Sequence, residues 1–475
     1  MTGILPAQAV INTAEALRVY ECDGLSAYRQ SPDCVLLPDT VAEVQAILRL
    51  CHKYNIPVVA RGAGTGLSGG ALPVVGGVVL SLARFDKILS IDPLARTATV
   101  QPGVRNISVS EAVAGHGLFY APDPSSQIAC TIGGNIAENS GGVHCLKYGL
   151  TLHNVLGIKF VTMTGDLLEL GGERLDNAGY DLLALLTGSE GMLGVIVEAT
   201  LRLIPSPTAY EVMLVSFATV AAAGNAVAEI IAEGIIPAGL EMMDQGITQA
   251  AEDFVHAGYP TDAAAILICE LDGNAAETQT QLQRVEEILK RAGAVDIRVA
   301  KDAQEQARFW AGRKAAFPAS GRIAPDYYCM DGTIPRRRIA DVLASFADLS
   351  EEYGLRVVNV FHAGDGNLHP LILYDAASPG ELHRAEQLGA RILEACVAAG
   401  GTVTGEHGVG IEKINQMCSQ FHSPELTQFH AIKQAFDPAG LLNPGKAVPT
   451  LKRCAEYGGL HVHHGQLPHP ELERF

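Results

Sequence analysis

The sequence has no long apolar run and few basic residues. No stretch of eighteen or more residues is apolar and uncharged, and the N-terminus lacks the basic-then-apolar order of a secretory signal. We therefore expect a cytoplasmic chain, with attachment to the inner face of the cell membrane through partners as the alternative. With 34 Lys and Arg against 52 Asp and Glu, the formal net charge is −18. This charge opposes contact with a phosphate backbone and predicts no nucleic-acid partner.

Closely paired cysteines are also missing. The 10 cysteines are scattered without any Cys-x-x-Cys pair, which excludes the common iron–sulfur and zinc-ribbon motifs and predicts reduced, mostly buried thiols. Glycine, in contrast, is abundant, with 50 residues among 475, and 48% of the chain is hydrophobic. This length and composition predict a large core and two or three domains.

The densest glycine segment is PVVARGAGTGLSGGA, residues 57–71. Upstream, residues 38–55 have a helical apolar stripe, with Thr40 and Glu43 at capping-box spacing, so a helix should lead into a short strand at 56–60. Downstream, residues 76–104 predict strands and not the helix that a dinucleotide-binding turn requires. The loop can instead form a nest of backbone N–H groups around a pyrophosphate, and a flexible surface loop is the alternative.

Two further segments are rich in small residues. Residues 121–149 combine two glycine pairs with short polar side chains, which predicts a second place where backbone presses against a ligand. Residues 156–170 predict a strand, a turn and a strand, and residues 185–205 predict a glycine-containing turn that enters a strand.

The C-terminal half contains a second set of candidate residues. Residues 355–375 predict two strands joined by an Ala-Gly-Asp-Gly-Asn turn, with His362 ending the first strand and His369 opening the second. Glu406 and His407 follow in a Gly-Glu-His-Gly turn. Two His and one carboxylate form a ligand set that leaves metal positions open for substrate. Hydrogen-bonded structural histidines are the alternative, and the residues alone favour neither interpretation.

A basic cluster and a His-rich tail complete the candidates. Arg313 follows the sole tryptophan by three positions within residues 309–338. The cluster is interpreted either as a solvated helix followed by a strand or as the source of a guanidinium that binds a substrate carboxylate. The tail, residues 461–475, lacks Cys or carboxylate at ligand spacing, so we expect a docking segment and not a metal site.

The glycine motifs resemble the FAD-binding domain of the vanillyl-alcohol-oxidase, or PCMH-type, flavoproteins. They are RGAGTGLSGG at 61–70, IGGN at 132–135, NSGG at 139–142 and GSEGMLG at 188–194. The motifs HAGDGNLH at 362–369, GEHG at 405–408 and DPAGLLNPGK at 437–446 resemble the FAD-linked D-2-hydroxy-acid dehydrogenases, which include D-lactate, D-2-hydroxyglutarate and bacterial glycolate dehydrogenases. The resemblance covers nearly the whole chain and is greatest to the FAD-linked subunits of bacterial glycolate oxidase.

This resemblance implies a fold and a cofactor. The implied fold class is α+β, with a two-part PCMH-type FAD-binding domain at 1–206, a cap domain of antiparallel sheet covered by helices at 207–430, and a segment at 431–475 that returns to the FAD domain. FAD should be bound non-covalently, because Thr65 stands where members with covalently attached FAD carry a His. The implied FAD-binding residues are Arg61, Gly62, Gly64, Thr65, Gly66, Ser68, Gly69, Pro122, Asp123, Ser126, Gly133, Gly134, Asn139, Gly141, Gly142, Glu190, Gly194, Ile196 and Asn443.

The resemblance also implies the chemistry. His362, His369 and Glu406 would bind a divalent ion, either Zn, Mn or Fe, and Arg313 would grip the substrate carboxylate. His407 would be the base, accepting the 2-hydroxyl proton at neutral pH with an ordinary histidine pKa near ~6.5. Hydride would pass from C2 to the flavin, and electrons would continue to a partner subunit or membrane acceptor. The implied partners are a second flavin-domain subunit and an iron–sulfur subunit.

Cys329 bears on the size of the substrate. It stands about where hydroxyglutarate-type relatives have a Lys for the distal carboxylate, which favours glycolate or D-lactate over D-2-hydroxyglutarate. Arg322 or Lys314 supplying that cation is the alternative. A D-lactate or D-2-hydroxyglutarate dehydrogenase acting alone and a non-catalytic flavin-carrying scaffold remain the other functional hypotheses.

Overall fold

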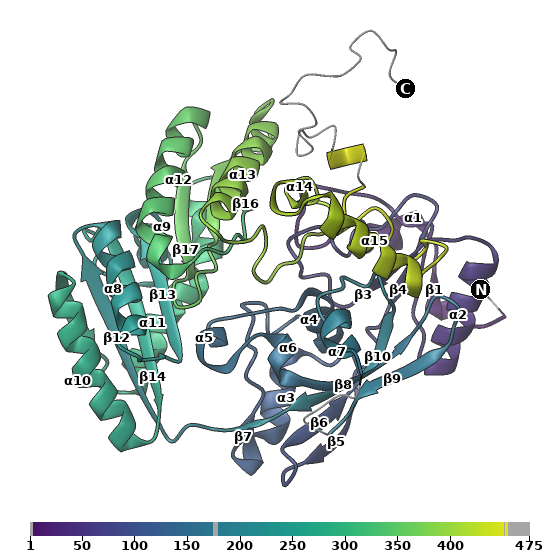
Figure 1. The fold of residues 1–475 in the computed structure, drawn as a ribbon, viewed down its shortest axis with the longest axis horizontal. Coiled ribbons are helices and arrows are strands. Elements are labelled where there is room, and N and C mark those ends of the chain that lie inside the picture. The colour runs from purple at the N-terminus through teal and green to yellow at the C-terminus, as the bar shows by residue number, and fades with distance from the viewer. Residues whose placement is uncertain (1–2, 174–178, 451, 455–475) are drawn as a thin grey trace.

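The computed structural model describes residues 3–173, 179–450 and 452–454. Figure 1 shows an N-terminal part with two sheets, a part built on a larger sheet, and a C-terminal segment that lies against the N-terminal part. The predicted α+β class, with an antiparallel sheet covered by helices, is confirmed. No helix among the described residues is both long and apolar enough to cross a bilayer.

The first sheet has four strands in the order β1-β2-β4-β3. The strands are β1 (Val10–Ile11), β2 (Cys34–Leu36), β3 (Val58–Arg61) and β4 (Val78–Ser81). Helix α2 (Val41–Lys53) follows β2 and buries its apolar stripe against this sheet. The expected capping box is present, since Thr40 Oγ1 accepts the Glu43 N–H at 3.2 Å and Glu43 Oε2 accepts the Thr40 N–H at 3.0 Å. The helix therefore delivers the chain into β3, whose last residue opens the glycine loop.

The second sheet has five antiparallel strands in the order β5-β6-β10-β8-β9. They are β5 (Ile88–Asp92), β6 (Thr97–Val100), β8 (Val155–Val161), β9 (Leu167–Gly171) and β10 (Val195–Arg202). Its apolar face packs on α3 (Asn106–Val113), α4 (Ile132–Glu138) and α7 (Leu182–Leu186). Shorter elements here are α1 (Ala14–Leu17), α5 (Cys145–Tyr148), α6 (Thr151–Asn154), β7 (Leu118–Phe119) and β11 (Ile204–Pro205).

One of the two glycine pairs in residues 121–149 lies in a helix. Gly133 and Gly134 lie in the first turn of α4. The physical reason is packing, because a Cβ on Gly133 would lie 2.5 Å from Cβ of Pro102. Glycine therefore lets this helix approach the preceding loop closely, and its small size rather than its dihedral freedom is used.

The third sheet has seven antiparallel strands in the order β15-β12-β14-β13-β17-β18-β16. They are β12 (Ala209–Phe217), β13 (Gly239–Asp244), β14 (Ala265–Gly273), β15 (Ala294–Val299), β16 (Asp326–Cys329), β17 (Val357–His362) and β18 (Pro370–Tyr374). One face is covered by α8 (Val220–Ala232), α10 (Ala275–Arg291), α12 (Ile339–Tyr353) and α13 (Glu381–Ala398), and the other by α9 (Gln245–Val255) and α11 (Ala303–Ala319). Two apolar cores thus hold β13, β17 and β18 rigidly.

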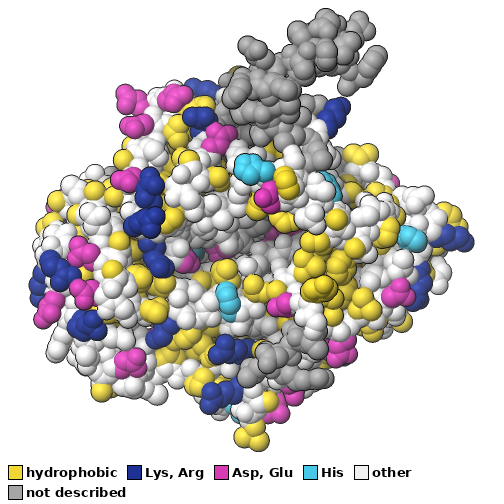
Figure 2. Space-filling view, viewed as in Figure 1, with side chains coloured by type: hydrophobic (Ala, Val, Ile, Leu, Met, Phe, Trp, Pro, Cys, Tyr) yellow, Lys and Arg dark blue, Asp and Glu magenta, His cyan; other side chains and the backbone are white. Residues whose placement is uncertain are grey.

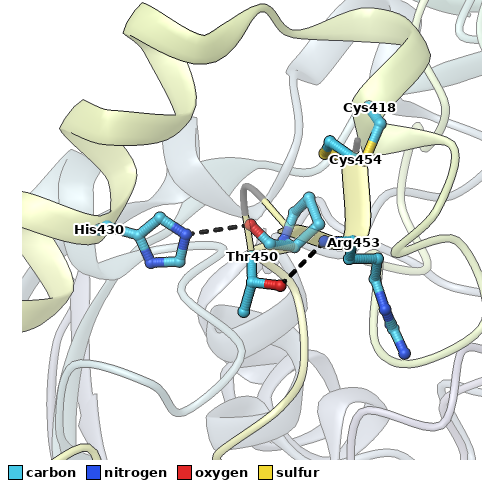
Figure 3. The surroundings of a disulfide bond; sticks show 6 residues. Cys418, His430, Thr450, Arg453 and Cys454 are labelled. Atoms are coloured by element: carbon cyan, nitrogen blue, oxygen red, sulfur yellow. Dashed lines mark hydrogen bonds between the residues drawn. A yellow bond between two sulfur atoms is a disulfide. The ribbon is translucent and has the colours of Figure 1, made fainter. Parts of the chain in front are cut away.

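The C-terminal segment contains α14 (Met417–Gln420) and α15 (Ser423–Phe436) and then joins the first sheet, where Leu442 bridges Val58 in parallel. The domain boundary drawn at residue 430 falls inside α15. The expectation that all cysteines are reduced is wrong for one pair, because Cys418 and Cys454 form a disulfide (Figure 3), while the other eight are free. The His-rich tail lies outside the described residues.

Candidate active site

One cavity lies between the N-terminal part and the seven-stranded part, and a hollow between them is visible in Figure 2. Its walls include residues 60–67 of the glycine loop, residues 130, 131, 133–135, 137 and 138 around α4, and residues 189–191. The opposite wall contains Phe317, His369, Glu406 and His407. The cavity thus joins the two sets of residues that the sequence predicted separately.

The glycine loop presents backbone to this cavity. Gly64 has φ +73, and a side chain there would collide with the guanidinium of Arg61, while a side chain at Gly62 would collide with Thr131 Oγ1. The loop is held from behind, because Arg61 Nη1 donates to the Cys22 carbonyl oxygen at 2.8 Å. A fixed loop of bare amides fits the polar, anionic part of a dinucleotide.

The predicted cofactor residues divide into lining and supporting groups. Those that line the cavity are Arg61, Gly62, Gly64, Thr65, Gly66, Ser126, Gly133, Gly134, Glu190, Gly194 and Ile196. Those that are not among the lining residues are Ser68, Gly69, Pro122, Asp123, Asn139, Gly141, Gly142 and Asn443.

Two supporting residues tie separate segments together. Asn443 Nδ2 donates to the Gly70 carbonyl at 3.0 Å and to the Glu190 carbonyl at 2.7 Å, so it fixes two lining loops and does not itself close over the cavity. Ser68 Oγ donates to the His407 carbonyl at 2.9 Å. The glycine loop is therefore bonded directly to the turn that carries Glu406 and His407.

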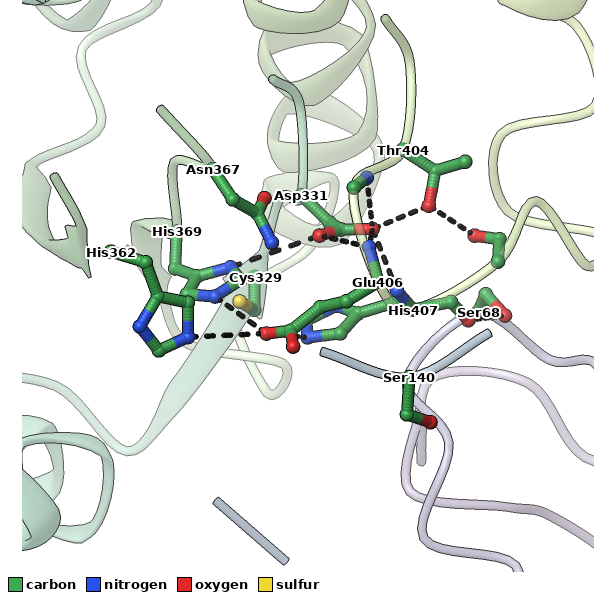
Figure 4. Close-up of polar contacts among 12 residues, drawn as sticks. Ser68, Ser140, Cys329, Asp331, His362, Asn367, His369, Thr404, Glu406 and His407 are labelled. Carbon is green, nitrogen blue, oxygen red and sulfur yellow. Dashed lines mark hydrogen bonds and ion pairs between the residues drawn. The ribbon is translucent and has the colours of Figure 1, made fainter. Parts of the chain in front are cut away.

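The three predicted metal ligands converge (Figure 4). Glu406 Oε1 lies 2.9 Å from His369 Nε2 and 3.4 Å from His362 Nε2. The His362 and His369 rings are 5.1 Å apart at their centroids, as the predicted hairpin requires. His362 Nε2 and Glu406 Oε2 are buried without a hydrogen-bond partner. Burial raises the pKa of Glu406, but the ring nitrogens of His362 and His369 close to its carboxylate outweigh burial and hold this pKa well below its usual range.

Glu241 on β13 is a site residue that the sequence analysis missed. Its Oε1 lies 2.7 Å from His362 Nδ1, and its Oε2 accepts a hydrogen bond from Arg313 Nε at 2.7 Å. Glu241 thereby directs His362 Nε2 toward Glu406. Arg313, predicted to grip substrate, is only 3% exposed and paired with Glu241, and it is not part of the cavity lining.

Asp331 is the second missed residue. This fully buried carboxylate accepts N–H hydrogen bonds from Gly405 at 3.1 Å, Glu406 at 3.2 Å and His407 at 2.9 Å. Three donors from consecutive residues fix the shape of the Gly-Glu-His-Gly turn. Burial raises the pKa of Asp331, but His407 and Lys413 outweigh it and the pKa is lowered.

His407 stacks on His369 with ring centroids 5.0 Å apart and lines the cavity. The expected ordinary pKa is wrong, because burial lowers the pKa of His407 to about 4. Its Nδ1 is buried without a hydrogen-bond partner. The imidazole is therefore neutral at pH 7 and carries a free lone pair in the cavity wall.

The surroundings of Cys329 bear on whether Arg322 or Lys314 supplies a cation for a second substrate carboxylate. Its sulfur lies within 4.8 Å of ring nitrogens of His369 and His407. Arg322 is exposed and lies over the Phe254 ring at 5.5 Å, and Lys314 is also exposed. Neither of these cations lines the cavity, so neither replaces a charge at Cys329.

Comparison with known proteins identifies similar sequences. Residues 32–171 match the family "FAD binding domain", and residues 206–447 match "FAD linked oxidases, C-terminal domain". The glycolate oxidase subunit GlcD of Escherichia coli K12 is 64% identical over 471 residues, covering 99% of this chain and 94% of the relative. GlcD of Bacillus subtilis is 41% identical, covering 90% and 91%, and D-lactate dehydrogenase of Anaerostipes hadrus is 32% identical, covering 89% and 91%.

Solved structures show the same fold. p-Cresol methylhydroxylase with bound substrate has a TM-score of 0.80 at 18% identity, covering 95% of this chain and 96% of that one. Alkyldihydroxyacetonephosphate synthase has a TM-score of 0.74 at 20% identity, covering 94% and 84%. The predicted PCMH-type fold is confirmed.

Proposed function

The chain belongs to the family of FAD-linked oxidases and is an FAD-linked oxidoreductase, and from this premise we propose that it oxidises a small 2-hydroxy acid to the 2-oxo acid. Glycolate is the proposed first substrate and D-lactate the second. The observation that carries the proposal is the single cavity in which His369, Glu406 and His407 face the glycine segments. A hydroxy acid held by the first group would lie beside a flavin held by the second.

FAD fits the glycine side of this cavity. Bare amides of residues 62–66 would hold its pyrophosphate, and Thr65 offers a hydroxyl where covalent attachment would need a nucleophilic ring nitrogen. We therefore infer non-covalent binding. When bound, FAD supplies the hydride acceptor.

A divalent ion fits the other side. The donors are two imidazole nitrogens, which bind a metal in their neutral form, and a carboxylate oxygen. Two buried atoms of the ligand residues, His362 Nε2 and Glu406 Oε2, have no hydrogen-bond partner among the described residues. Glu241 holds the Nδ1 proton of His362, which leaves Nε2 as the ligand atom. When bound, the ion supplies positive charge that lowers the pKa of the substrate hydroxyl, and Zn, Mn and Fe all suit this set.

The protein moves the proton and limits substrate size. His407, neutral at pH 7, accepts the 2-hydroxyl proton at a ring nitrogen in the cavity wall. Phe317 lies edge-on to His369 at 6.3 Å and closes the cavity with an apolar surface. The thiol of Cys329, whose pKa burial raises well above its usual range, adds no charge there. Among the described residues that line this wall, a second carboxylate on the substrate would meet no Lys or Arg side chain.

Arg313 retains a place in the proposal. Glu241 contacts both the guanidinium of Arg313 and the ring of His362, so Arg313 is held close to His362. We propose that it neutralises Glu241 and thereby holds the contact between Glu241 and His362 in place. The GlcD relatives are named as subunits of glycolate oxidase, and we propose two partner subunits for this chain, one with a second flavin domain and one with an iron–sulfur centre. The intact His362, His369, Glu406 and His407 set disfavours a non-catalytic scaffold.

The test is anaerobic reduction of the flavin by a panel of 2-hydroxy acids. Glycolate and D-lactate should bleach the oxidised flavin spectrum with a second-order rate constant at least about 10-fold above that of D-2-hydroxyglutarate, because an unpaired distal carboxylate would be buried at a cost above 1.4 kcal/mol. Rapid bleaching by D-2-hydroxyglutarate would overturn the substrate assignment. Failure of every hydroxy acid to bleach the flavin would overturn the catalytic proposal.

A further inference from the structure

Glu138, the last residue of α4, has no assigned role and lines the cavity. Its side chain lies between the glycine loop and the turn that carries His407. A Cβ on Gly70 would be 2.7 Å from Glu138 Oε1, and a side chain on Gly408 would collide with Oε2. Oε2 is buried and has no hydrogen-bond partner among the described residues. A polar atom left in this state requires a partner from the cavity.

A second carboxylate lies close by, and the two differ in their surroundings. Glu190 accepts the N–H of Val409 at 2.7 Å on Oε1 and the N–H of Gly410 at 2.7 Å on Oε2. Among the residues that the structure describes, no backbone N–H donates to Glu138 Oε2. Because amide donors stabilise a carboxylate, the negative charge of the pair belongs on Glu190 and the proton on Glu138. Burial, and then repulsion by Glu190 and Asp23, raise the pKa of Glu138 well above its usual range.

The nearby cations do not pair with Glu138. Lys446 Nζ donates to the carbonyls of Gly70, at 2.9 Å, and Leu72. Lys413 Nζ donates to the carbonyl of Gly408 at 3.0 Å and lies 2.8 Å from a carboxylate oxygen of Glu412. Both ammonium groups therefore direct their hydrogen bonds to other oxygens. Oε2 of Glu138 is therefore left with a hydrogen to donate and no acceptor among the described residues.

We propose that Glu138 is a neutral carboxylic acid that donates a hydrogen bond to a carbonyl oxygen or ring nitrogen of the bound flavin and favours its reduced form. This inference rests on the proposed binding of FAD in the cavity. The flavin is preferred to the substrate as the acceptor because Glu138 belongs to α4 and faces Gly70 of the glycine loop, and these two segments form the FAD side. A donor here stabilises the reduced ring more than the oxidised ring, because reduction adds electron density to the acceptor atoms.

The experiment measures the flavin midpoint potential in the FAD-loaded, substrate-free enzyme by spectroelectrochemistry. Glu138→Ala removes the donor, and we expect at least a tenfold loss in the equilibrium constant for reduction, which is about 30 mV for a two-electron couple. Glu138→Gln keeps a neutral donor and should stay within about threefold of wild type. Glu111→Gln, an exposed acid on α3, is the matched control and should leave the potential unchanged.

Other outcomes overturn the proposal. A potential that rises in Glu138→Gln would show that the wild-type carboxyl is ionised. An unchanged potential in Glu138→Ala with a raised KM for the hydroxy acid would assign the contact to the substrate. If Glu138→Ala does not hold FAD, the reduced-minus-oxidised infrared difference spectrum provides the test. The wild type should show a shifted carbonyl band of a protonated carboxyl group, and Glu138→Gln should lack this band. Absence of the band from the wild type would overturn the proposal. A preparation without FAD would instead refute the proposed function.

Discussion

At the scale of single residues, the site depends on side chains that hold other side chains. Glu241 orients His362 from 121 positions away, and Asp331 fixes the backbone of His407 from 76 positions away. Neither carboxylate lines the cavity. Both carboxylates are buried and hydrogen-bonded. Glu241 therefore holds the ring of His362 in one orientation, and Asp331 holds the Gly-Glu-His-Gly turn in one conformation.

The first residue-scale prediction concerns Glu406→Gln. An amide replaces the carboxylate between His362 and His369, so the charge that a divalent ion requires is lost. We expect bound metal to fall below about one tenth of the wild-type content and kcat/KM for glycolate to fall at least about 100-fold, since metal-ion stabilisation contributes several kcal/mol. Metal analysis and dye-linked turnover measure these two quantities.

The control for this variant is Glu352→Gln on the exposed side of α12, which should keep both metal and turnover. The FAD spectrum of Glu406→Gln should remain that of the wild type, because the glycine segments are unchanged. Full metal content together with normal turnover would show that Glu406 is not a ligand.

At the scale of elements, α5 joins the two halves of the molecule. His144, just before α5, places Nδ1 2.8 Å from Asp123 Oδ2 and Nε2 3.1 Å from Glu270 Oε1 on β14. Lys147 and Tyr148 both contact the carboxylate of Asp272, at the end of β14. A short helix and the residue before it thus bind two carboxylates of β14 and connect the N-terminal part to the seven-stranded sheet.

This arrangement predicts a pH dependence. Burial lowers the pKa of His144, but Asp123 and Glu270 outweigh burial and raise this pKa well above 6.5. A raised folded-state pKa means that the stabilisation is fully present below about pH 6.5, the unfolded value, and is lost as pH rises through the folded pKa. The stabilisation is on the order of 1–2 kcal/mol for a charged hydrogen bond at a partly exposed site.

Thermal melts from pH 6 to pH 9 measure this effect. The Tm of the wild type should fall with rising pH more steeply than that of His144→Gln, whose amide does not titrate. His153→Gln, at the neighbouring α6, is a control that should retain the wild-type slope. Parallel slopes for wild type and His144→Gln would show that His144 is not charged in the folded state.

At the scale of the whole molecule, the chain ends by returning to its beginning. Leu442 and Asn443 pair with β3. The disulfide between Cys418 and Cys454, which are 36 positions apart, closes a loop that contains both residues. Closing a loop of this length restricts the unfolded chain and stabilises the fold by about 3–4 kcal/mol in the entropic description. The segment carrying Asn443 and Lys446 is thereby held against the glycine loop.

The prediction is that the oxidised, denatured protein has eight titratable thiols and that reduction raises the number to ten. The double variant Cys418→Ser/Cys454→Ser should have a lower Tm than wild type under non-reducing conditions and an equal Tm in the presence of reductant. Cys34→Ser, which removes a free thiol, should not change the response to reductant. Ten thiols in the unreduced protein would exclude the disulfide.

The sequence by itself determined the parts that depend on neighbouring residues. The capping box at Thr40, the glycine loop and the hairpin that joins His362 to His369 each use interactions within a few positions, and pattern and turn chemistry record these directly. The family resemblance then linked these parts into one FAD-linked fold, which the comparisons confirmed.

Only the tertiary structure decided which distant residues share a contact. Arg313 meets Glu241 across 72 positions, Gly133 packs on a proline, and Glu138 faces Gly408 from another part of the chain. Helical and strand periodicity specify which face of an element is buried, but they do not specify the partner of a buried charge. That partner is selected when elements distant in the sequence pack together, because only then does desolvation require each carboxylate and guanidinium to find its counterpart.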